Sequence, residues 1–257
     1  MKNQIATYIE QKIPEFHQRR LDSLTGLNLD KVLMRKNAYL FKAKNINTAG
    51  GLVKAILDAH LSSQEETVFG AFLENVAIHA CSIALGGIKS GIEGIDLEFS
   101  QDGTRYIVSI KSGPNWGNSS QIKKMKDYFR KAKIVLRQNG TVKTVVAVNG
   151  CCYGRDNKPD KGDYHKFCGE QFWTLISGET NLYLDLIEPL GHKAKLRNDE
   201  FQIEYDKVTN KFTGLFIDEY CLPDGSIDWE KIVKLNSATT KPIKPRAQRK
   251  TKKVIKK

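Results

Sequence analysis

The pair Asp102-Gly103 constrains the fold of this chain more than any other short feature. It separates two segments, GIDLEFS at residues 94–100 and RYIVSIK at residues 105–111, whose alternating and β-branched residues are typical of strands. Asp-Gly between two such segments is a strong signal for a hairpin with a two-residue turn. The sequence therefore predicts a β-hairpin in which Gln101 pairs with Thr104.

This register places three polar side chains on one face of the hairpin. Counting back from the turn, Glu98 faces Ile107 and Asp96 faces Ser109, and side chains alternate between faces with a period of two. Asp96, Ser109 and Lys111 therefore share a face, with Asp96 and Lys111 as diagonal neighbours. Diagonal neighbours have backbones roughly 7–8 Å apart, which long side chains can bridge. The hairpin thus predicts a carboxylate and an ammonium group close together at one end of a sheet.

A plain Asp–Lys ion pair on a solvated hairpin face would explain this arrangement. Two further features favour a functional site. The apolar residues Ile107, Val108 and Ile110 indicate burial on both faces, and the Gly- and Asn-rich loop that follows leads to a helix start at Ser119/Ser120, whose amides could face an anion. A carboxylate beside a lysine suits metal-assisted phosphodiester hydrolysis, because Mg²⁺ prefers oxygen ligands and the ammonium can stabilise developing negative charge.

These residues resemble a known family. Asp96 followed by Ser-Ile-Lys at residues 109–111 resembles the short motif of the PD-(D/E)XK nuclease superfamily. The run IKSGPNWGNSSQ, with GIDLEF before it and CCYGRDN and FWTLISG after it, resembles the PmeII-like group of type II restriction endonucleases over roughly residues 60–190. The resemblance implies an α/β, restriction-endonuclease-like mixed β-sheet core flanked by helices. It also implies Mg²⁺, cleavage of double-stranded DNA at a short sequence, and a homodimer.

The resemblance assigns roles to the residues of the hairpin. Asp96 would be the main metal ligand, Lys111 would orient the attacking water, and the backbone carbonyl of Ile110 would be a further ligand. The position of the family's second acid holds Ser109, which would occupy the place of the missing carboxylate.

A second carboxylate must then come from outside the Ser-x-Lys motif. We expect it to be Glu74, an acid among apolar residues in the helix before the hairpin, because the superfamily resemblance supports a glutamate there. Glu98 is held in reserve, because it lies on the correct face but one pair nearer the turn. An exposed helix acid and a solvent-facing strand residue are the respective alternatives.

The loop and helix after the motif supply the expected DNA contacts. They are Asn115, Trp116, Asn118, Ser119, Ser120, Gln121 and Lys123, together with Arg155 in a later basic loop. Trp116 could instead pack on the core, and packing is the favoured interpretation for that residue.

Hydrophobic spacing along the rest of the chain predicts helices with a few further strands. The N-terminal segments read as helices, and Pro14 is expected to interrupt the first; the others cover Asn28–Lys44, Gly51–Leu61 and Ser63–Leu85. After the hairpin we expect a helix with an apolar stripe from Ile122 to Leu136, a strand at Val142–Asn149, helices at Gly169–Ser177 and Asn181–Lys195, and a strand at Phe201–Val208. The whole predicts a single nuclease domain over residues 1–235, with a helical N-terminal part at 1–62 and a catalytic core at about 63–190.

The net charge of +12 is concentrated at one end of the chain. The segment Asn236–Lys257 holds nine Lys or Arg residues and no acid. This composition predicts a disordered tail that attracts nucleic acid independently of sequence and in a salt-sensitive way.

Composition excludes several other classes of protein. The sequence has no run of roughly 18 apolar residues and no apolar signal core, so we expect a cytoplasmic protein without a membrane partner. The sequence has no nucleotide-binding fingerprint, so we expect no small-molecule cofactor. Among the five cysteines, the group Cys151, Cys152, His165 and Cys168 could bind zinc, but the spacing favours ordinary thiols.

Two rival functions stay open at the level of sequence. A nuclease of the same superfamily that acts on damaged or branched DNA would share the same motif. A DNA-binding protein with a decayed nuclease site is indicated by Ser109. Metal-dependent cleavage separates the second rival from the other functions.

Overall fold

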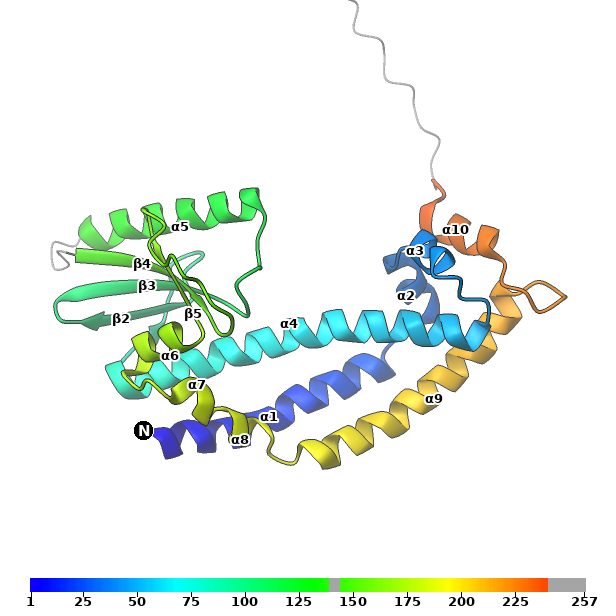
Figure 1. Ribbon diagram of the computed structural model, residues 1–257, viewed down its shortest axis with the longest axis horizontal. Helices are drawn as coiled ribbons and strands as arrows, with labels where there is room; N and C mark the ends of the chain where they lie inside the picture. The colour runs from blue at the N-terminus through cyan, green and yellow to red at the C-terminus, as the bar shows by residue number, and fades with distance from the viewer. Residues whose placement is uncertain (139–143, 240–257) are drawn as a thin grey trace, which may run out of the picture. The chain divides into compact units, whose positions relative to one another are not determined.

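The computed structural model describes residues 1–138 and 144–239, and their contacts divide the chain into two compact units (Figure 1). Unit 1 comprises residues 1–26 and 61–208; unit 2 comprises residues 27–60 and the described residues from 209 onward. The single nuclease domain expected over residues 1–235 stays a prediction.

Unit 1 contains a five-stranded mixed sheet in the order β1-β2-β3-β4-β5 (Figure 1). The first three strands pair antiparallel, whereas β3, β4 and β5 run parallel to one another. The strands are β1 (Ile88–Lys89), β2 (Leu97–Gln101), β3 (Thr104–Lys111), β4 (Thr144–Cys151) and β5 (His165–Cys168). This is the α/β mixed sheet with flanking helices that the sequence predicts.

The predicted hairpin and its register are confirmed. Gln101 pairs with Thr104 and Glu98 pairs with Ile107 across β2 and β3. Asp102 and Gly103 have φ values of 50° and 73°, and positive φ at both central residues matches the twist of a two-residue hairpin turn.

Helices cover both faces of the sheet. On one face, α4 (Ala49–Leu85) and α6 (Glu170–Ser177) enclose a core with Val108, Ile110 and Val148. On the other, α5 (Ser119–Gln138) packs its predicted stripe against the sheet; this core contains Ile107, Met125, Phe129, Ala132, Val145 and Ala147. Because side chains alternate along β3, Ser109 and Lys111 belong to the α5 face.

Several helices depart from the predicted boundaries. The first, α1 (Lys2–Thr25), continues through Pro14 instead of being interrupted there. The side chains of Ile9 and Ile13, which precede this position, are buried, so packing offsets the hydrogen bond that proline cannot make. Two short helices, α7 (Leu182–Asp185) and α8 (Ile187–Leu190), replace the single helix expected over residues 181–195.

The strand expected at Phe201–Val208 is wrong, because these residues lie inside α9 (Ala194–Tyr220). The aromatic residues that indicate a strand locally also recur at helical spacing. Phe201 stacks on Tyr205 four residues later, and the buried residues Phe212 and Phe216 continue the stripe. A period near 3.6 residues therefore outweighs the local preference of aromatic residues for strands.

The two helices expected before the hairpin form one continuous helix, α4. Among the described residues, α4 is long and apolar enough to cross a membrane by length and composition alone. Such a helix was not expected from the sequence. Core helices of soluble proteins meet the same test, and in unit 1 Val76, Ala77 and Ala80 of α4 are fully buried in the core.

Unit 2 is helical and contains α2 (Leu29–Arg35), α3 (Ala38–Ala43) and α10 (Trp229–Ser237). The side-chain amide of Asn236 donates to the carbonyls of Leu33, Met34 and Lys36 at 3.0–3.2 Å. These carbonyls lie at the end of α2, where the helix leaves acceptors without internal partners. The expected tail boundary at Asn236 is therefore wrong for Asn236 and Ser237, which belong to α10. The rest of the predicted tail, from residue 240, lies outside the described residues, as does the start of the predicted strand at Val142.

We predict that Asn236→Ala lowers the free energy of unfolding by about 1–3 kcal/mol, because three helix-end carbonyls lose their donor. Urea denaturation followed by circular dichroism measures the change. The control is Lys234→Ala on the same helix, whose side chain is exposed and pairs with Glu230, and which should change stability little. Equal unfolding midpoints for Asn236→Ala and the unmodified protein would contradict the assignment.

Candidate active site

Asp96 lies one residue before β2, and its carboxylate is anchored to the neighbouring strand β3. Its Oδ2 atom accepts a hydrogen bond of 2.6 Å from the backbone N–H of Ile110 and one of 3.4 Å from the hydroxyl of Ser109. The ammonium nitrogen of Lys111 lies 4.0 Å from the same oxygen. The hairpin thus brings Asp96, Ser109 and Lys111 together, as its register predicts.

Lys111 ends β3 and is held from two sides. Asp96 lies on one side, and on the other the Nζ atom is 5.3 Å from the centre of the Trp116 ring. About a third of the lysine side chain and a quarter of the aspartate side chain are exposed, at 31% and 26%. Both groups are therefore fixed in position yet open to a substrate.

Glu74 reaches the same region from α4. Burial, together with the negative charge of Asp96, raises the pKa of Glu74 above its usual range, and Lys89 and Lys111 oppose this shift. The ammonium nitrogen of Lys89 lies 4.0 Å from Oε1 of Glu74. Glu74 is thus a half-buried acid that feels both members of the Asp96–Lys111 pair, and not the exposed helix residue of the alternative interpretation.

Glu98 has a different environment. Its Oε2 atom accepts from the Nη2 and Nε atoms of Arg105 at 2.8 and 3.2 Å, and its Oε1 atom accepts from the hydroxyl of Ser90 at 2.6 Å. The side chain is only 7% exposed, so the solvent-facing alternative is wrong. Because both oxygens are held by these partners, Glu98 has the contacts of a structural residue that joins β1, β2 and β3.

The donor groups around Asp96 fit a hard divalent cation. Two carboxylates and a backbone carbonyl offer the oxygen ligands that Mg²⁺ prefers. Burial and the negative charge of Asp96 both raise the pKa of Glu74, and a bound cation would relieve this cost of ionisation. Over residues 1–138 and 144–239, no group of three or more His, Cys, Asp or Glu side chains forms a metal site, so a two-carboxylate site would need further ligands from the backbone or water.

The cysteines that could bind zinc have the properties of buried thiols. Burial raises the pKa of Cys152 to about 12, and it raises the pKa of Cys151 further still. His165 stacks on Phe167 instead of approaching a thiol as a ligand would. Among the residues that the structure describes, these side chains do not form a group that could hold a metal ion.

The expected DNA-contact residues lie on an exposed loop and helix start. All of them except Trp116 are exposed, and Arg155 lies in a separate loop. Asn118, and not a serine, caps α5: its Oδ1 accepts from the N–H of Gln121 at 3.1 Å, while Oε1 of Gln121 accepts from the N–H of Asn118 at 3.0 Å. This reciprocal capping box fixes where the helix starts, and it occupies part of the hydrogen-bonding capacity of both residues.

Trp116 packs inward, as the favoured interpretation holds. It lies against the core between α5 and the sheet, and its Nε1–H donates to Oδ1 of Asn149 at 3.0 Å. Asn149 is 1% exposed and donates in turn to the backbone carbonyl of Ser109 at 3.2 Å. Sequence reasoning missed Asn149, although a lone amide at the end of the apolar run VVAVN was a usable signal.

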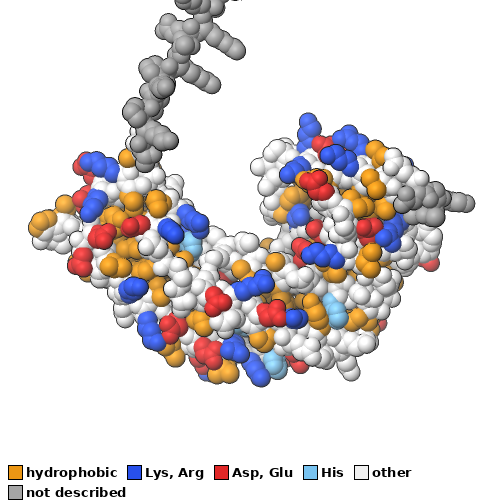
Figure 2. All heavy atoms as spheres, turned by 180° about the vertical axis from the view of Figure 1, so that it is seen from behind, with side chains coloured by type: hydrophobic (Ala, Val, Ile, Leu, Met, Phe, Trp, Pro, Cys, Tyr) orange, Lys and Arg blue, Asp and Glu red, His pale blue; other side chains and the backbone are white. Residues whose placement is uncertain are grey.

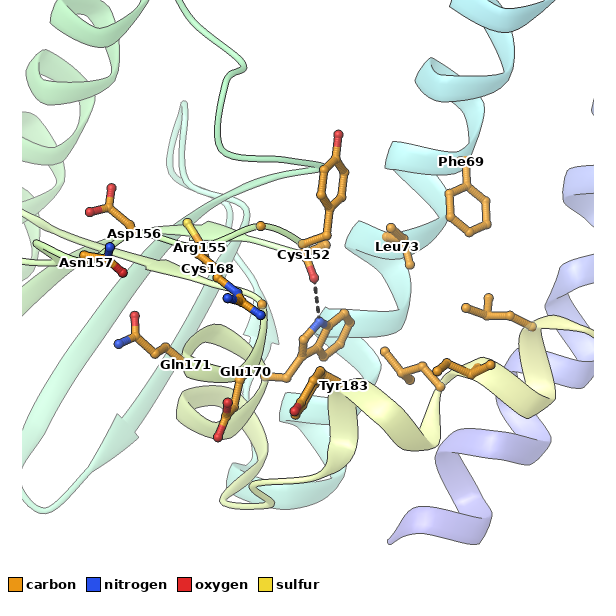
Figure 3. A pocket seen from close by; sticks show the side chains of 17 residues that line it. Phe69, Leu73, Cys152, Arg155, Asp156, Asn157, Cys168, Glu170, Gln171 and Tyr183 are labelled. Atoms are coloured by element: carbon orange, nitrogen blue, oxygen red, sulfur yellow. Dashed lines mark hydrogen bonds between the residues drawn. The ribbon is translucent and has the colours of Figure 1, made fainter.

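Two pockets are lined by residues among the expected DNA contacts. A pocket of about 620 Å³ is lined on one side by Arg155, Asn157 and Gln171 and on the other by Phe69 and Leu73 of α4 (Figure 3). A second, of about 520 Å³, runs along α5 and is lined mainly by basic residues: Lys123, Lys126, Arg130, Lys133 and Arg137. Figure 2 shows Lys and Arg side chains gathered over α5, with acidic side chains among them. Lys126 pairs with Asp163 and Arg130 pairs with Asp127.

A mixed sheet that carries an Asp–Lys pair at the end of its hairpin defines a restriction-endonuclease-like protein. The family model of the type II restriction endonuclease EcoO109I matches residues 3–198, and the chain belongs to this family. Membership of this family indicates a site-specific deoxyribonuclease, and members of the family generally use a divalent metal. The narrower resemblance to the PmeII-like group is not confirmed by this match. No curated protein matches the chain.

We predict that Glu74→Gln stabilises the metal-free protein at neutral pH. Because the folded-state pKa of Glu74 is raised, ionisation of this group above that pKa costs stability, and the cost is absent below the unfolded-state value of about 4.3. The gain from Glu74→Gln should therefore be present at pH 7.5 and vanish near pH 4.

Urea denaturation in the presence of a chelator, at the two pH values, measures this difference. Glu66→Gln is the matched control, because Glu66 is an exposed acid on the same helix. If Glu74→Gln left the midpoint at pH 7.5 unchanged or lowered it, the raised pKa of Glu74 and the cost of its ionisation would be disproved.

Proposed function

We propose that this protein is a Mg²⁺-dependent type II restriction endonuclease that hydrolyses phosphodiester bonds in double-stranded DNA at a short specific sequence. The observation that carries the proposal is the Asp96–Lys111 pair, 4.0 Å apart at the end of β3, in a chain of this endonuclease family. We propose further that it acts in the cytoplasm as a homodimer, because two-fold symmetry suits the two half-sites of a palindromic target.

The residues have distinct roles in this proposal. Asp96 and Glu74, with the backbone carbonyl of Ile110, would hold the metal. A bound Mg²⁺ would supply Lewis-acid activation of water and of the scissile phosphate. Lys111 would orient the attacking water and offset negative charge that develops on the phosphate, and its position beside Asp96 supports this role. Ser109 would assist by donating its hydroxyl to Asp96, which leaves the other carboxylate oxygen, Oδ1, for the metal.

Glu98 receives no metal role in this proposal. Its two oxygens are bound to Arg105 and Ser90, so a cation there would have to displace an ion pair that is largely buried. Glu74 is the better second ligand, because it is half-buried beside Asp96, its pKa is raised by burial and by that carboxylate, and its ion pair with Lys89 is long, at 4.0 Å.

DNA would lie against the exposed loop and helix start that follow the motif. The candidate contacts are Asn115, Asn118, Ser119, Ser120, Gln121, Lys123 and Arg155, and the basic pocket along α5 extends this surface. Lysines and arginines there would bind phosphates, which position the duplex, whereas amide side chains of the loop could read base edges.

One observation favours a second candidate, a DNA-binding protein without nuclease activity. Ser109 stands where the family resemblance places an acid, and one carboxylate alone is a weak divalent-cation site. The half-buried acid Glu74 supports the active alternative. Digestion of plasmid DNA with Mg²⁺, and sequencing of the resulting ends, separates the two candidates and gives the recognition site.

We predict that Asp96→Ala and Lys111→Ala each reduce DNA cleavage by at least about 10²–10³-fold, because each removes a group that acts on the reacting atoms. Binding of the same DNA in Ca²⁺ should survive. We also expect Glu74→Gln to reduce Mg²⁺-dependent cleavage much more than Glu98→Gln does. Cleavage at a near-normal rate by either alanine variant would refute the assignment, and a reversed order of the two glutamate variants would move the second ligand to Glu98.

We predict that deletion of residues 240–257 leaves the cleavage sequence unchanged but weakens DNA binding at low salt. The deletion keeps all of α10 and removes the nine basic residues of the segment. For every phosphate that the segment neutralises, its removal should reduce the slope of log affinity against log salt by about 0.9. Salt titrations with specific and random duplexes measure the slopes, and equal slopes for the two proteins would show that the segment does not bind DNA.

A further inference from the structure

A series of three contacts connects β3 through β4 to the lysine of the candidate active site. It begins at the backbone carbonyl of Ser109 in β3, which accepts a hydrogen bond of 3.2 Å from the amide of buried Asn149 in β4. The carbonyl oxygen of that amide accepts the Nε1–H of Trp116 at 3.0 Å, and the ring of Trp116 lies 5.3 Å from the ammonium of Lys111. The path therefore returns to β3 only two residues from its start.

The sheet register gives this path its rigidity. Ser109 lies opposite Asn149 in the parallel pairing of β3 with β4, and Lys111 lies opposite Cys151. Asn149 is 1% exposed, so the buried amide has little freedom to exchange its partners for water. The thiol of Cys151 also approaches Oδ1 of Asn149, at 4.0 Å.

The loop that carries Trp116 is tied down independently. Lys166 of β5 donates from its ammonium to the carbonyl of Pro114 at 2.9 Å, and it also pairs with Asp156 at 3.7 Å. The ring of Tyr153 packs over Gly113, where a Cβ atom would lie only 2.3 Å from it. The tryptophan ring is thus fixed both by its own hydrogen bond and by the loop that presents it.

The ring and the carboxylate act on Lys111 in complementary ways. An ammonium group is attracted to the face of an indole ring, and the ring also restricts the directions in which a long side chain can extend. Without the ring, the ion pair with Asp96 at 4.0 Å would have to hold the ammonium in place. A single ion pair at that distance leaves the four-carbon side chain several rotamers.

We propose that Trp116 and Asn149 are positioning residues that hold the Lys111 ammonium in its catalytic orientation, and that Trp116 is not a DNA-reading residue. This inference rests on the proposed role of Lys111. It replaces the direct DNA contact expected for Trp116, because its one hydrogen-bond donor is already used inside the protein. Outer groups that orient a reacting side chain typically change activity by about 10–100-fold when they are removed.

The kinetic test uses a plasmid that the unmodified protein cleaves with Mg²⁺, under single-turnover conditions with enzyme in excess. Trp116→Leu should lower the cleavage rate constant by about 10–100-fold and leave the dissociation constant measured in Ca²⁺ within about threefold. Trp116→Phe keeps an aromatic face but cannot donate to Asn149, and it should recover part of the rate. Asn149→Ala should behave like Trp116→Phe.

A second readout does not depend on cleavage. Mild acetylation followed by mass spectrometry reports how accessible each lysine amine is. Trp116→Leu should raise the labelling rate of Lys111 several-fold, while Lys124, which lies over the ring of Tyr128 instead, should keep its rate. Trp116→Phe tests the same point with less disturbance of packing, should the leucine variant unfold.

The outcomes separate this inference from the proposed function. Unchanged labelling of Lys111 in both tryptophan variants would overturn the positioning role, and so would a loss confined to DNA affinity, which would make Trp116 a DNA contact. Normal cleavage by Lys111→Ala would instead overturn the proposed catalytic role of the lysine. Slower cleavage with unchanged DNA affinity, together with faster labelling of Lys111, supports the inference.

Discussion

The register of the β2–β3 hairpin is the constraint on which the site depends. Side chains alternate strictly along a strand, so a slip of one residue would move Ser109 and Lys111 to the opposite face and away from the α5 side of the sheet. The two-residue turn at Asp102-Gly103 fixes the register at one end, and the bond from the Ile110 amide to Asp96 fixes it at the other. The buried Glu98–Arg105 pair lies between these two points and adds a third restraint.

The acids of this region divide into two kinds. Glu98 has its charge matched by a two-nitrogen contact with Arg105, which is the arrangement of a structural ion pair. Glu74 is half-buried near Asp96 and has only a distant lysine, Lys89, as a direct partner among the residues that the structure describes. An acid that is costly to ionise lowers the stability of the metal-free protein at neutral pH. Such groups concentrate at sites that bind cations or move protons.

The sequence predicted the contacts within the hairpin well. It predicted the contacts between residues far apart in the chain less well. A period-two pattern and a two-residue turn determine which hairpin residues face one another, so the grouping of Asp96 with Lys111 followed from spacing alone. The environment of Glu98 depends on Ser90 and on β1, a two-residue strand with no recognisable pattern, and its burial was missed. Asn149 was missed because its partners are 33 and 40 residues away along the chain. The helical state of Phe201–Val208 was missed because aromatic residues favour strands locally. Their spacing over the longer segment is that of a helix, and this spacing decides the structure.

The groups proposed to act in catalysis come from two parts of the fold. Asp96 and Lys111 are joined by a hairpin, which can form from local interactions, whereas Glu74 is delivered by α4 only when that helix packs against the finished sheet. On the proposed assignment, a chain that has formed its hairpin but not its core holds a lysine and one carboxylate, and has no competent metal site. On that assignment, nuclease activity would therefore appear only with the completed fold.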